Sequence, residues 1–391
     1  METKPSRIAY ILAARFPTEK AYGITTRETI NSLVNLDIRT RLFCLESSFI
    51  DSDDQIKSEI HNLQESGLSK LLRKFSLTCF KKIGAIFWVL SLISLLLNNL
   101  KVIRIYNPSL IWTRNPIIAY FFSKYLPFCK IVLEVHETNL KFFLKKILKN
   151  PKNIKVFFTN SQLLQSFSRD GSKENLSFLA PLGIRSDSLT TQLECNDFLA
   201  NLKHRKHFMV GYIGGFAAGG YSKGVEDLIF MAEYAQRNKF PISIVLIGAT
   251  ESEKLHFDAL TRDLGIRESF LDIKLRVPHS KALKLMKTFD VLILPAPKSS
   301  SYDGVPLKLL EYFASGRITL IADTKLNREI LPNDLNNFFY SPSDYENTWL
   351  LIKNAINSGE LSQRIFKSVD YSSKFTWDIR TRNILATVNQ S

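Results

Sequence analysis

Short apolar runs rich in β-branched residues alternate along the chain with stretches of helical periodicity. In the first half these runs are IAYILAA, RTRLFCL, VIRIY, SLIWT, KIVLEV and KVFFT, and in the second half MVGYIG, SIVLIG, DVLILP and ITLIAD. Strands that are apolar on both faces are typical of parallel sheets covered by helices. The pattern therefore predicts an α/β protein with two Rossmann-like, doubly wound parallel sheets, one in each half.

A polar stretch, SDSLTTQLECNDFLANLKHRKH, interrupts this pattern between Gly183 and Phe208. The 391 residues also exceed the length at which one hydrophobic core stops growing. We predict an N-terminal domain over 1–190, a linker in the polar stretch and a second domain over 205–365. Ligands of open parallel sheets bind beyond the carboxyl ends of the strands, so we expect two facing sheets to share one cleft.

Basic side chains outnumber acidic ones by 52 to 37, which gives a formal net charge of +15. This excess favours a partner that carries phosphate, such as a nucleotide, an anionic membrane or a nucleic acid. Nucleic-acid binding has no supporting motif here, because the sequence lacks an RNP-like pattern, zinc-finger spacing and a continuous basic arm. The four scattered cysteines form no disulfide or zinc pattern, and a cytoplasmic location is expected.

The segment SSSYDGVPLKLLEYFASGRITLIAD, residues 299–323, joins two predicted strands through a loop and a helix. Gly304 frees the loop backbone, and Pro306 suits the first turn of a helix. Amides at the start of that helix can face an anion, with the helix dipole favouring negative charge. The amides concerned belong to Val305, Leu307 and Lys308.

Lys308 and Glu311 are three residues apart, so they share one face of this helix. The cation suits a phosphate, whereas the carboxylate can accept hydrogen bonds from a pair of ribose hydroxyls. A solvated ion pair on an amphipathic helix is the alternative interpretation.

A second candidate for anion binding is GYIGGFAAGGYSKGV, residues 211–225. Gly214 and Gly215 permit close approach of the backbone to a phosphate, and Lys223 lies at the start of the next helix. The segment has neither a Walker A pattern nor a strict G-x-G-x-x-G. An ordinary glycine-rich turn with a solvated lysine explains this segment equally well when it is taken alone.

The order of these motifs resembles the donor-binding domain of GT-B glycosyltransferases of family 4. That family has a glycine loop with Lys-Gly, a V-P turn, a strand ending in Pro and an acid-G-x-P-x-K-x-x-E-Y-x-A-x-G helix. FPTEKAYGITTRETINSL, SLIWTRN, VLEVHETN and FFTNSQ resemble the family's N-terminal half more weakly. FTWDIRTRNIL resembles the helix that returns to the N-terminal domain, which we place in 366–391.

The resemblance implies a retaining transferase that uses a nucleotide-diphosphate sugar, with neither a metal nor another cofactor. Lys223 and Lys308 would neutralise the diphosphate, and Glu311 would bind the ribose. The turn at Val277 and Pro278 would read the base through its backbone.

Three further roles follow from the same resemblance. Asp303 would hold hydroxyls of the donor sugar, His136 would face that sugar from the other domain, and Gly23 would line the nucleotide and acceptor side. Two departures from the family pattern concern the donor. No arginine stands beside the glycine loop, and Asp303 replaces the more common glutamate.

Two further alternatives remain beside a basic nucleic-acid-binding protein. Asp51 and Asp53 form a D-x-D pattern that could hold a divalent metal, although aspartates in such a polar run before a helix are commonly caps. A nucleotide-sugar epimerase of the same fold would bind a similar donor without transferring it.

Residues 68–100 combine a basic amphipathic helix with an apolar one. Leu68, Leu71 and Phe75 keep helical spacing, and Lys70 and Lys74 lie off that stripe. The uncharged part, 83–100, is marginal for a membrane span, so we expect the segment to lie on the cytoplasmic face of an anionic membrane; a buried core helix is the alternative. A glycan or lipid-linked acceptor, as in surface polysaccharide or glycolipid synthesis, would fit that location.

Overall fold

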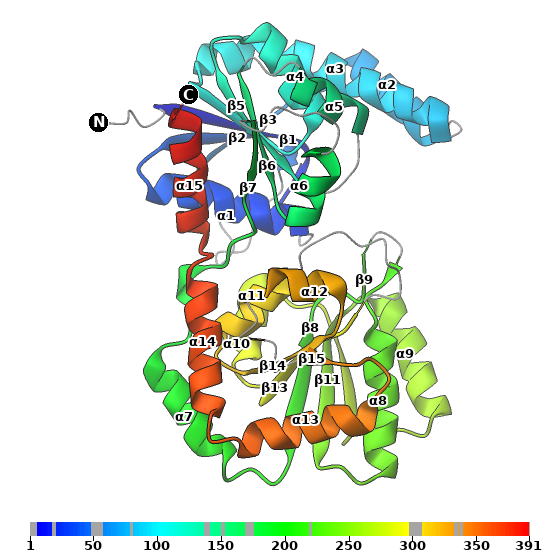
Figure 1. Cartoon of the computed structure of the whole chain (residues 1–391). Helices are drawn as coiled ribbons and strands as arrows, with labels where there is room; N and C mark the ends of the chain where they lie inside the picture. The colour runs from blue at the N-terminus through cyan, green and yellow to red at the C-terminus, as the bar shows by residue number, and fades with distance from the viewer. Residues whose placement is uncertain are drawn as a thin grey trace. The chain divides into compact units, whose positions relative to one another are not determined.

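The computed structural model describes residues 6–17, 21–47, 58–78, 81–136, 141–149, 153–168, 176–218, 221–296, 307–331, 335 and 339–390. The chain forms two compact α/β units (Figure 1). The first unit comprises Met1–Leu182 and Trp377–Ser391, and the second comprises Gly183–Thr376. The main sheet of each unit is parallel, which confirms the predicted fold class.

Within the described residues, the sheet of the first unit has seven parallel strands in the order β3-β2-β1-β4-β5-β6-β7. The strands are β1 (Arg7–Phe16), β2 (Arg39–Ser47), β3 (Glu59–Asn62), β4 (Leu110–Thr113), β5 (Lys130–Val135), β6 (Ile154–Phe158) and β7 (Ser177–Leu179). The order reverses between β1 and β4. Ligands of doubly wound sheets bind at such a reversal, beyond the carboxyl ends of the strands.

Helices cover both faces of this sheet (Figure 1). They are α1 (Ala21–Asn35), α2 (Gly67–Thr78), α3 (Lys81–Tyr106), α4 (Pro116–Tyr125), α5 (Lys141–Lys149), α6 (Ser161–Ser168) and α15 (Trp377–Asn389). Apolar side chains of α3, α4, α5 and α6 form the core on one face, and those of α1 and α15 form the core on the other. The C-terminal helix α15 is therefore part of the first unit.

The second unit repeats this arrangement with the strand order β12-β11-β8-β13-β14-β15 in its described residues. These strands are β8 (Phe208–Ile213), β11 (Ile242–Ala249), β12 (Leu271–Leu275), β13 (Val291–Leu294), β14 (Ile318–Ala322) and β15 (Phe339–Tyr340); β9 (Ala217–Ala218) and β10 (Tyr221–Ser222) form a separate antiparallel pair. The order of the main sheet reverses between β8 and β13, so its expected ligand position lies beyond the ends of these two strands.

The helical elements of the second unit pack around its main sheet (Figure 1). They are η3 (Ser186–Ser188), α7 (Gln192–Leu202), α8 (Val225–Arg237), α9 (Glu251–Asp263), α10 (His279–Met286), α11 (Leu307–Ala314), α12 (Lys325–Ile330), α13 (Tyr345–Asn357) and α14 (Leu361–Ser373). Side chains of α7, α8, α13 and α14 contribute to one core, and those of α10 and α11 contribute to the other.

The predicted linker is wrong, because most of the polar stretch is folded. Thr191 and Glu194 form a capping box that starts α7, and Cys195, Phe198 and Leu202 are buried in the core of the second unit. Three buried apolar residues in eleven suffice for a helix that packs through one narrow face. The observed division also differs from the predicted boundaries, because 183–190 and 366–376 belong to the second unit.

The run VIRIY is also not a strand, although its composition favours one. It forms the last turns of α3, where Ile103 and Tyr106 are three residues apart and bury their side chains in the core. A short apolar run cannot be assigned to a strand or a helix by periodicity alone.

Residues 68–100 include α2 and the first part of α3, which pack together as a hairpin of two helices. Ser69 and Ser91 are buried between them, and the Ser91 hydroxyl donates to the Ser69 carbonyl at 2.8 Å. The rings of Phe75 and Phe87 pack with their centroids 5.5 Å apart. Figure 1 shows α2 extending outward from the rest of the first unit.

Candidate functional site

A glycine turn at the carboxyl end of β8 brings Lys308 against the backbone. A β-carbon at Gly214 would lie 1.6 Å from Cε of Lys308, so only glycine leaves room for the lysine side chain. Gly248, at the end of β11, has φ +131°, and a β-carbon there would lie 2.2 Å from the Gly214 carbonyl oxygen. The two glycines therefore let the ends of β8 and β11 and the start of α11 approach closely.

Three cations gather around this turn. Lys223 precedes α8, Arg276 follows β12, and Lys308 is in the first turn of α11. The guanidinium of Arg276 donates through Nε to the Gly248 carbonyl at 3.1 Å, and its Nη2 lies 3.6 Å from a β-carbon built on Gly215. The glycine loop itself has no neighbouring arginine in the sequence. Arg276, which comes from another segment of the chain, lies beside the glycine turn instead.

Burial and mutual repulsion lower the pKa values of two of these cations, Lys223 and Lys308. Burial, together with the charges of Lys308 and Arg276, lowers the pKa of Lys223 to about 7, and Glu253 offsets this only in part. Burial also lowers the pKa of Lys308, which Glu311 counteracts and Arg276 reinforces. An anion placed among the three side chains would relieve this repulsion.

Glu311 lies on the same face of α11 as Lys308 and is held by a histidine. Nε2 of His279, the first residue of α10, lies 2.7 Å from Oε1 of Glu311, and both side chains are almost fully buried. Burial raises the pKa of Glu311, but His279 and Lys308 outweigh it and lower the pKa overall. The carboxylate therefore stays ionised and can accept hydrogen bonds from hydroxyl groups.

The remaining predicted donor residues divide into two groups. Val277 and Pro278 form the turn between β12 and α10, between Arg276 and His279, and Pro278 is the residue that caps α10. Leu307 is the first residue of α11. Four predicted residues lie outside the described residues: Asp303, Gly304, Val305 and Pro306. The predicted D-x-D residues Asp51 and Asp53 also lie outside them.

Sequence reasoning missed Arg276 and His279. Both residues flank the V-P turn, so their position next to a predicted site residue could have singled them out. Their partners were not, because Gly248 and Glu311 are 28 and 32 residues away along the chain. Only the order of strands in the sheet brings these segments together.

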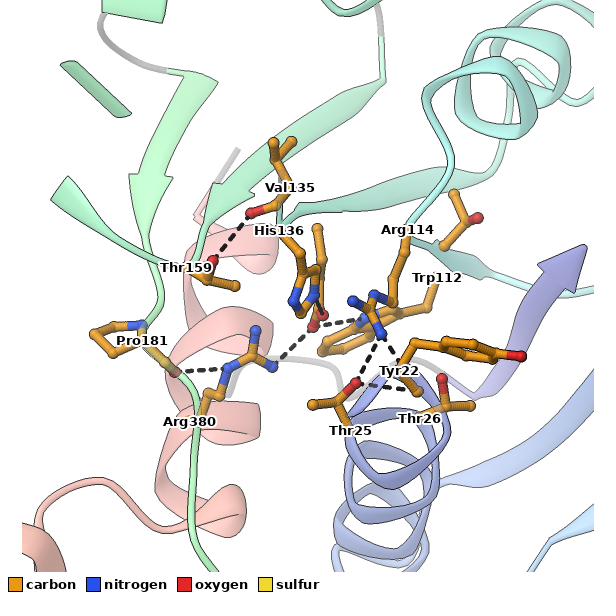
Figure 2. A network of polar contacts seen from close by, with 12 residues as sticks. Tyr22, Thr25, Thr26, Trp112, Arg114, Val135, His136, Thr159, Pro181 and Arg380 are labelled. Carbon is orange, nitrogen blue, oxygen red and sulfur yellow. Dashed lines mark hydrogen bonds and ion pairs between the residues drawn. The ribbon is translucent and has the colours of Figure 1, made fainter. Parts of the chain in front are cut away.

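His136 belongs to a separate network in the first unit (Figure 2). It follows β5 directly, and its Nε2 lies 3.0 Å from Oε2 of the buried Glu134. Burial and the nearby Arg114 lower the pKa of His136 to about 4, despite the opposing effect of Glu134. The imidazole is therefore neutral at physiological pH.

Arg114 connects this network to α1, the helix that carries Gly23 in its first turn. The Arg114 guanidinium donates through Nη1 to the Thr25 hydroxyl at 2.7 Å and to the Tyr22 carbonyl at 3.3 Å (Figure 2). Arg114, His136 and the start of α1 thus lie at the ends of β4, β5 and β1, where the strand order reverses. The described residues of both units therefore place polar side chains at the ligand position of their sheets.

Two parallel, doubly wound units of this kind define the GT-B fold, and solved structures share it over the whole chain. HepE from Anabaena in complex with UDP-glucose matches with a TM-score of 0.64 and 13% identity, covering 98% of this chain and 100% of that one. Sucrose-phosphate synthase from Thermosynechococcus elongatus matches with a TM-score of 0.69 and 15% identity, covering 97% of both chains. WaaG, a glycosyltransferase involved in lipopolysaccharide biosynthesis, matches with a TM-score of 0.63 and 12% identity, covering 97% of this chain and 99% of that one.

The match to a sequence family is confined to the second unit. Residues 201–369 match the family described as Glycosyl transferases group 1. That range contains the three cations and Glu311. No curated protein matches the chain in sequence. At these low identities the solved structures establish the fold, while the function must be argued from the site.

Proposed function

We propose that the protein is a retaining glycosyltransferase of family 4 that transfers a sugar from a nucleotide-diphosphate donor. The observation that carries this proposal is the cluster of Lys223, Arg276 and Lys308 beside Glu311, at the carboxyl ends of strands in a domain that matches group 1 glycosyl transferases. In it three cations meet one carboxylate. A nucleoside diphosphate offers the complementary groups, phosphates and a ribose diol.

The cations would act most strongly on the leaving group. As the bond between the sugar carbon and the diphosphate oxygen breaks, negative charge grows on the phosphate, and fixed positive charges stabilise it. The acceptor oxygen then bonds to the same sugar carbon, and its proton passes to a phosphate oxygen on that face. We infer that the three side chains supply the charge that a divalent metal supplies in other transferases.

Glu311 would select the nucleotide. An ionised carboxylate accepts hydrogen bonds from the two ribose hydroxyls, and the His279 contact at 2.7 Å fixes the orientation of the carboxylate. The turn at Val277 and Pro278 would contact the base, Asp303 and His136 would bind the donor sugar, and Gly23 would line the acceptor side. The roles of these five residues rest on the family resemblance.

We further propose that the hairpin of α2 and α3 docks on an anionic membrane surface. Its apolar side chains are exposed to an unusual degree, for example Leu68 at 58%, Leu71 at 51% and Ile86 at 62%. Lys70, Arg73 and Lys74 are exposed on the same hairpin. An apolar surface with adjoining basic residues suits the boundary between acyl chains and anionic headgroups.

The packing of α3 favours lying on the membrane over crossing it. Ile83–Tyr106 is the one helix segment of the described residues that is long and apolar enough to span a bilayer, with a mean hydropathy of 2.0. Its second half, however, is fixed on the sheet, where Leu92, Leu96 and Ile103 are buried in the core. The first half alone is too short to span.

Membrane docking fits an acceptor presented at the inner face of the cell membrane. WaaG, which shares the fold, is involved in lipopolysaccharide biosynthesis. We therefore propose a glycan or lipid-linked acceptor, such as an intermediate of surface polysaccharide or glycolipid synthesis, and a cytoplasmic, peripheral location.

A ligand screen tests the donor site. UDP-, GDP- and ADP-sugars are added to the purified protein, and thermal unfolding is followed; a ligand at 100 times its Kd stabilises by about 2.7 kcal/mol. We expect one nucleotide class to stabilise the protein and a single-stranded oligonucleotide of equal charge to have no effect. Product analysis with the stabilising donor then separates transfer to an acceptor from epimerisation, which changes the donor without one. Stabilisation by the oligonucleotide alone would contradict the proposal.

A further inference from the structure

Glu134 is a buried carboxylate with three hydrogen-bond donors around it. The donors belong to Trp112, His136 and Arg380, which are labelled in Figure 2. Its side chain is 1% exposed. Oε1 accepts from Nη1 of Arg380 at 2.7 Å and from Nε1 of Trp112 at 3.0 Å, and Oε2 lies 3.0 Å from Nε2 of His136. Burial raises the pKa of Glu134, but Arg380 and His136 lower it far below the usual range overall. The carboxylate is therefore ionised at neutral pH.

The ionised state of Glu134 determines which nitrogen of His136 carries the proton. A carboxylate can only accept hydrogen bonds, and a neutral imidazole has one donor and one acceptor nitrogen. Nε2 must therefore carry the proton in order to bond to Oε2. Nδ1 is left as the acceptor nitrogen of the ring.

Arg380 reaches this carboxylate from a distant part of the chain. It lies in α15, 246 residues from Glu134, and its side chain is 4% exposed. Its Nε donates to the Pro181 carbonyl at 2.8 Å, and its guanidinium lies over the Trp377 ring at 5.5 Å from the centroid. Pro181 and Trp377 flank the two points at which the chain passes between the units. Arg380 thus contacts Glu134 and one residue beside each of these two points, all within the first unit.

We propose that Arg380 is a positioning residue that acts through Glu134 to hold His136 as the Nε2–H tautomer, so that Nδ1 accepts a hydrogen bond from a sugar hydroxyl. The part played by His136 in sugar transfer rests on the proposed function. The tautomer itself does not. A C-terminal helix that packs on the first unit thereby sets the chemistry of a residue at the end of β5.

The other charged and titratable groups near His136 are consistent with a neutral ring. Arg114, which follows β4, is positive and disfavours a second proton on the ring. Tyr10 of β1 is buried, and burial raises its pKa, so it stays neutral. Glu134 therefore faces the imidazole as its one anionic partner among the described residues that affect it.

Glu134→Gln tests the tautomer directly. The amide has nearly the same shape, and its oxygen can still accept from Arg380 and Trp112. Its NH₂ group then faces His136 and requires an acceptor there, so the ring should change to the Nδ1–H tautomer. Protein labelled with ¹⁵N-histidine shows the protonated ring nitrogen in long-range ¹H–¹⁵N spectra, and His136→Gln assigns the signal.

We expect wild type to show Nε2–H and Glu134→Gln to show Nδ1–H. The kcat for sugar transfer should fall about 10- to 100-fold, the range for presenting a buried polar partner with the wrong hydrogen-bond polarity. The KM for the donor should change less, because the donor phosphates are bound in the second unit. Trp112→Phe is the matched control, since it removes a donor from Glu134 but leaves the carboxylate charged, and it should keep Nε2–H.

Arg380 variants test the distant contact. Arg380→Met removes a positive charge that lowers the pKa of His136, so that pKa should rise from about 4. Arg380→Lys retains the charge, so it should keep the low pKa of His136 and most of the wild-type kcat. If Arg380→Met does not fold, Arg380→Lys and Glu134→Gln still test the inference.

The outcomes separate this inference from the proposed function. An unchanged tautomer in Glu134→Gln, or an unchanged His136 pKa in Arg380→Met, would overturn the inference even if the wild type transfers sugar. A wild type that transfers no sugar, together with the expected NMR changes, would instead refute the function. If Arg380→Met lowers thermal stability but leaves kcat and the His136 tautomer unchanged, the role of Arg380 is structural only.

Discussion

Binding of the donor should consume a proton, because Lys223 is only half protonated near neutral pH. Its pKa of about 7 follows from burial and from the positive charges of Lys308 and Arg276. A diphosphate placed among these cations favours the ammonium form and raises the pKa again. Lys223 must then be protonated in the complex at pH values at which it is neutral in the free protein.

The sign and size of the effect follow from this shift. The free protein loses the Lys223 proton as the pH rises through 7, so donor affinity falls in the same direction. If the pKa in the complex is above about 9, the Kd should rise about fivefold between pH 7 and pH 8. At pH 8 binding should take up about 0.9 proton. A nucleotide sugar is the suitable probe, because its diphosphate has no group that titrates in this range.

Calorimetric titration at pH 8 measures the proton uptake. The same donor titration in HEPES and in Tris gives apparent enthalpies that differ by the uptake multiplied by the difference in buffer ionisation enthalpy. Lys223→Met should abolish the difference and flatten the pH dependence of Kd. Its loss of affinity relative to wild type should be largest at the lower pH.

A matched variant excludes the other candidate group. His279 is the residue of this cluster whose side-chain type also titrates near neutrality. His279→Gln should keep the uptake of about 0.9 proton, although donor affinity decreases because Glu311 loses its partner. Equal uptake by wild type and Lys223→Met, or no uptake by wild type, would refute the protonation of Lys223 on donor binding.

Three further predictions concern turnover, metal dependence and membrane binding. Lys308→Ala should lower kcat about 100-fold or more, with a small change in thermal stability, because its charge acts on the leaving phosphate; near-normal transfer would exclude Lys308 from the donor site. Transfer should survive EDTA, whereas complete loss that Mn²⁺ restores would favour a metal mechanism. Joint replacement of Lys70, Arg73 and Lys74 by glutamine should reduce sedimentation with anionic vesicles and its sensitivity to salt, since each charge contributes about 1 kcal/mol. A triple glutamine variant of exposed lysines in the second unit should sediment like wild type, and equal binding to neutral vesicles would contradict electrostatic docking. The lysines of that control are Lys203, Lys206 and Lys353.

The sequence by itself determined the fold class and singled out three members of the charge cluster, namely Lys223, Lys308 and Glu311. Apolar strands with β-branched residues require burial on both faces, and their alternation with helical stretches indicates a helix-covered parallel sheet. Lys308 and Glu311 share a helical face because they are three residues apart. Gly214 lies in a glycine-rich turn directly after a strand, a position that favours close approach. Each of these inferences depends on residues that are close in the chain.

Tertiary structure decided everything that depends on distant partners. Arg276 meets the glycine turn and His279 meets Glu311 because β12, β11, β8 and β13 stand side by side in that order, which no local pattern specifies. The run VIRIY became helical because the core beside it accepts one face of α3. The Arg380 contact with Glu134 spans 246 residues and exists only because α15 packs on the first sheet. Local periodicity fixes which side chains share a face, whereas the sheet order fixes which faces meet.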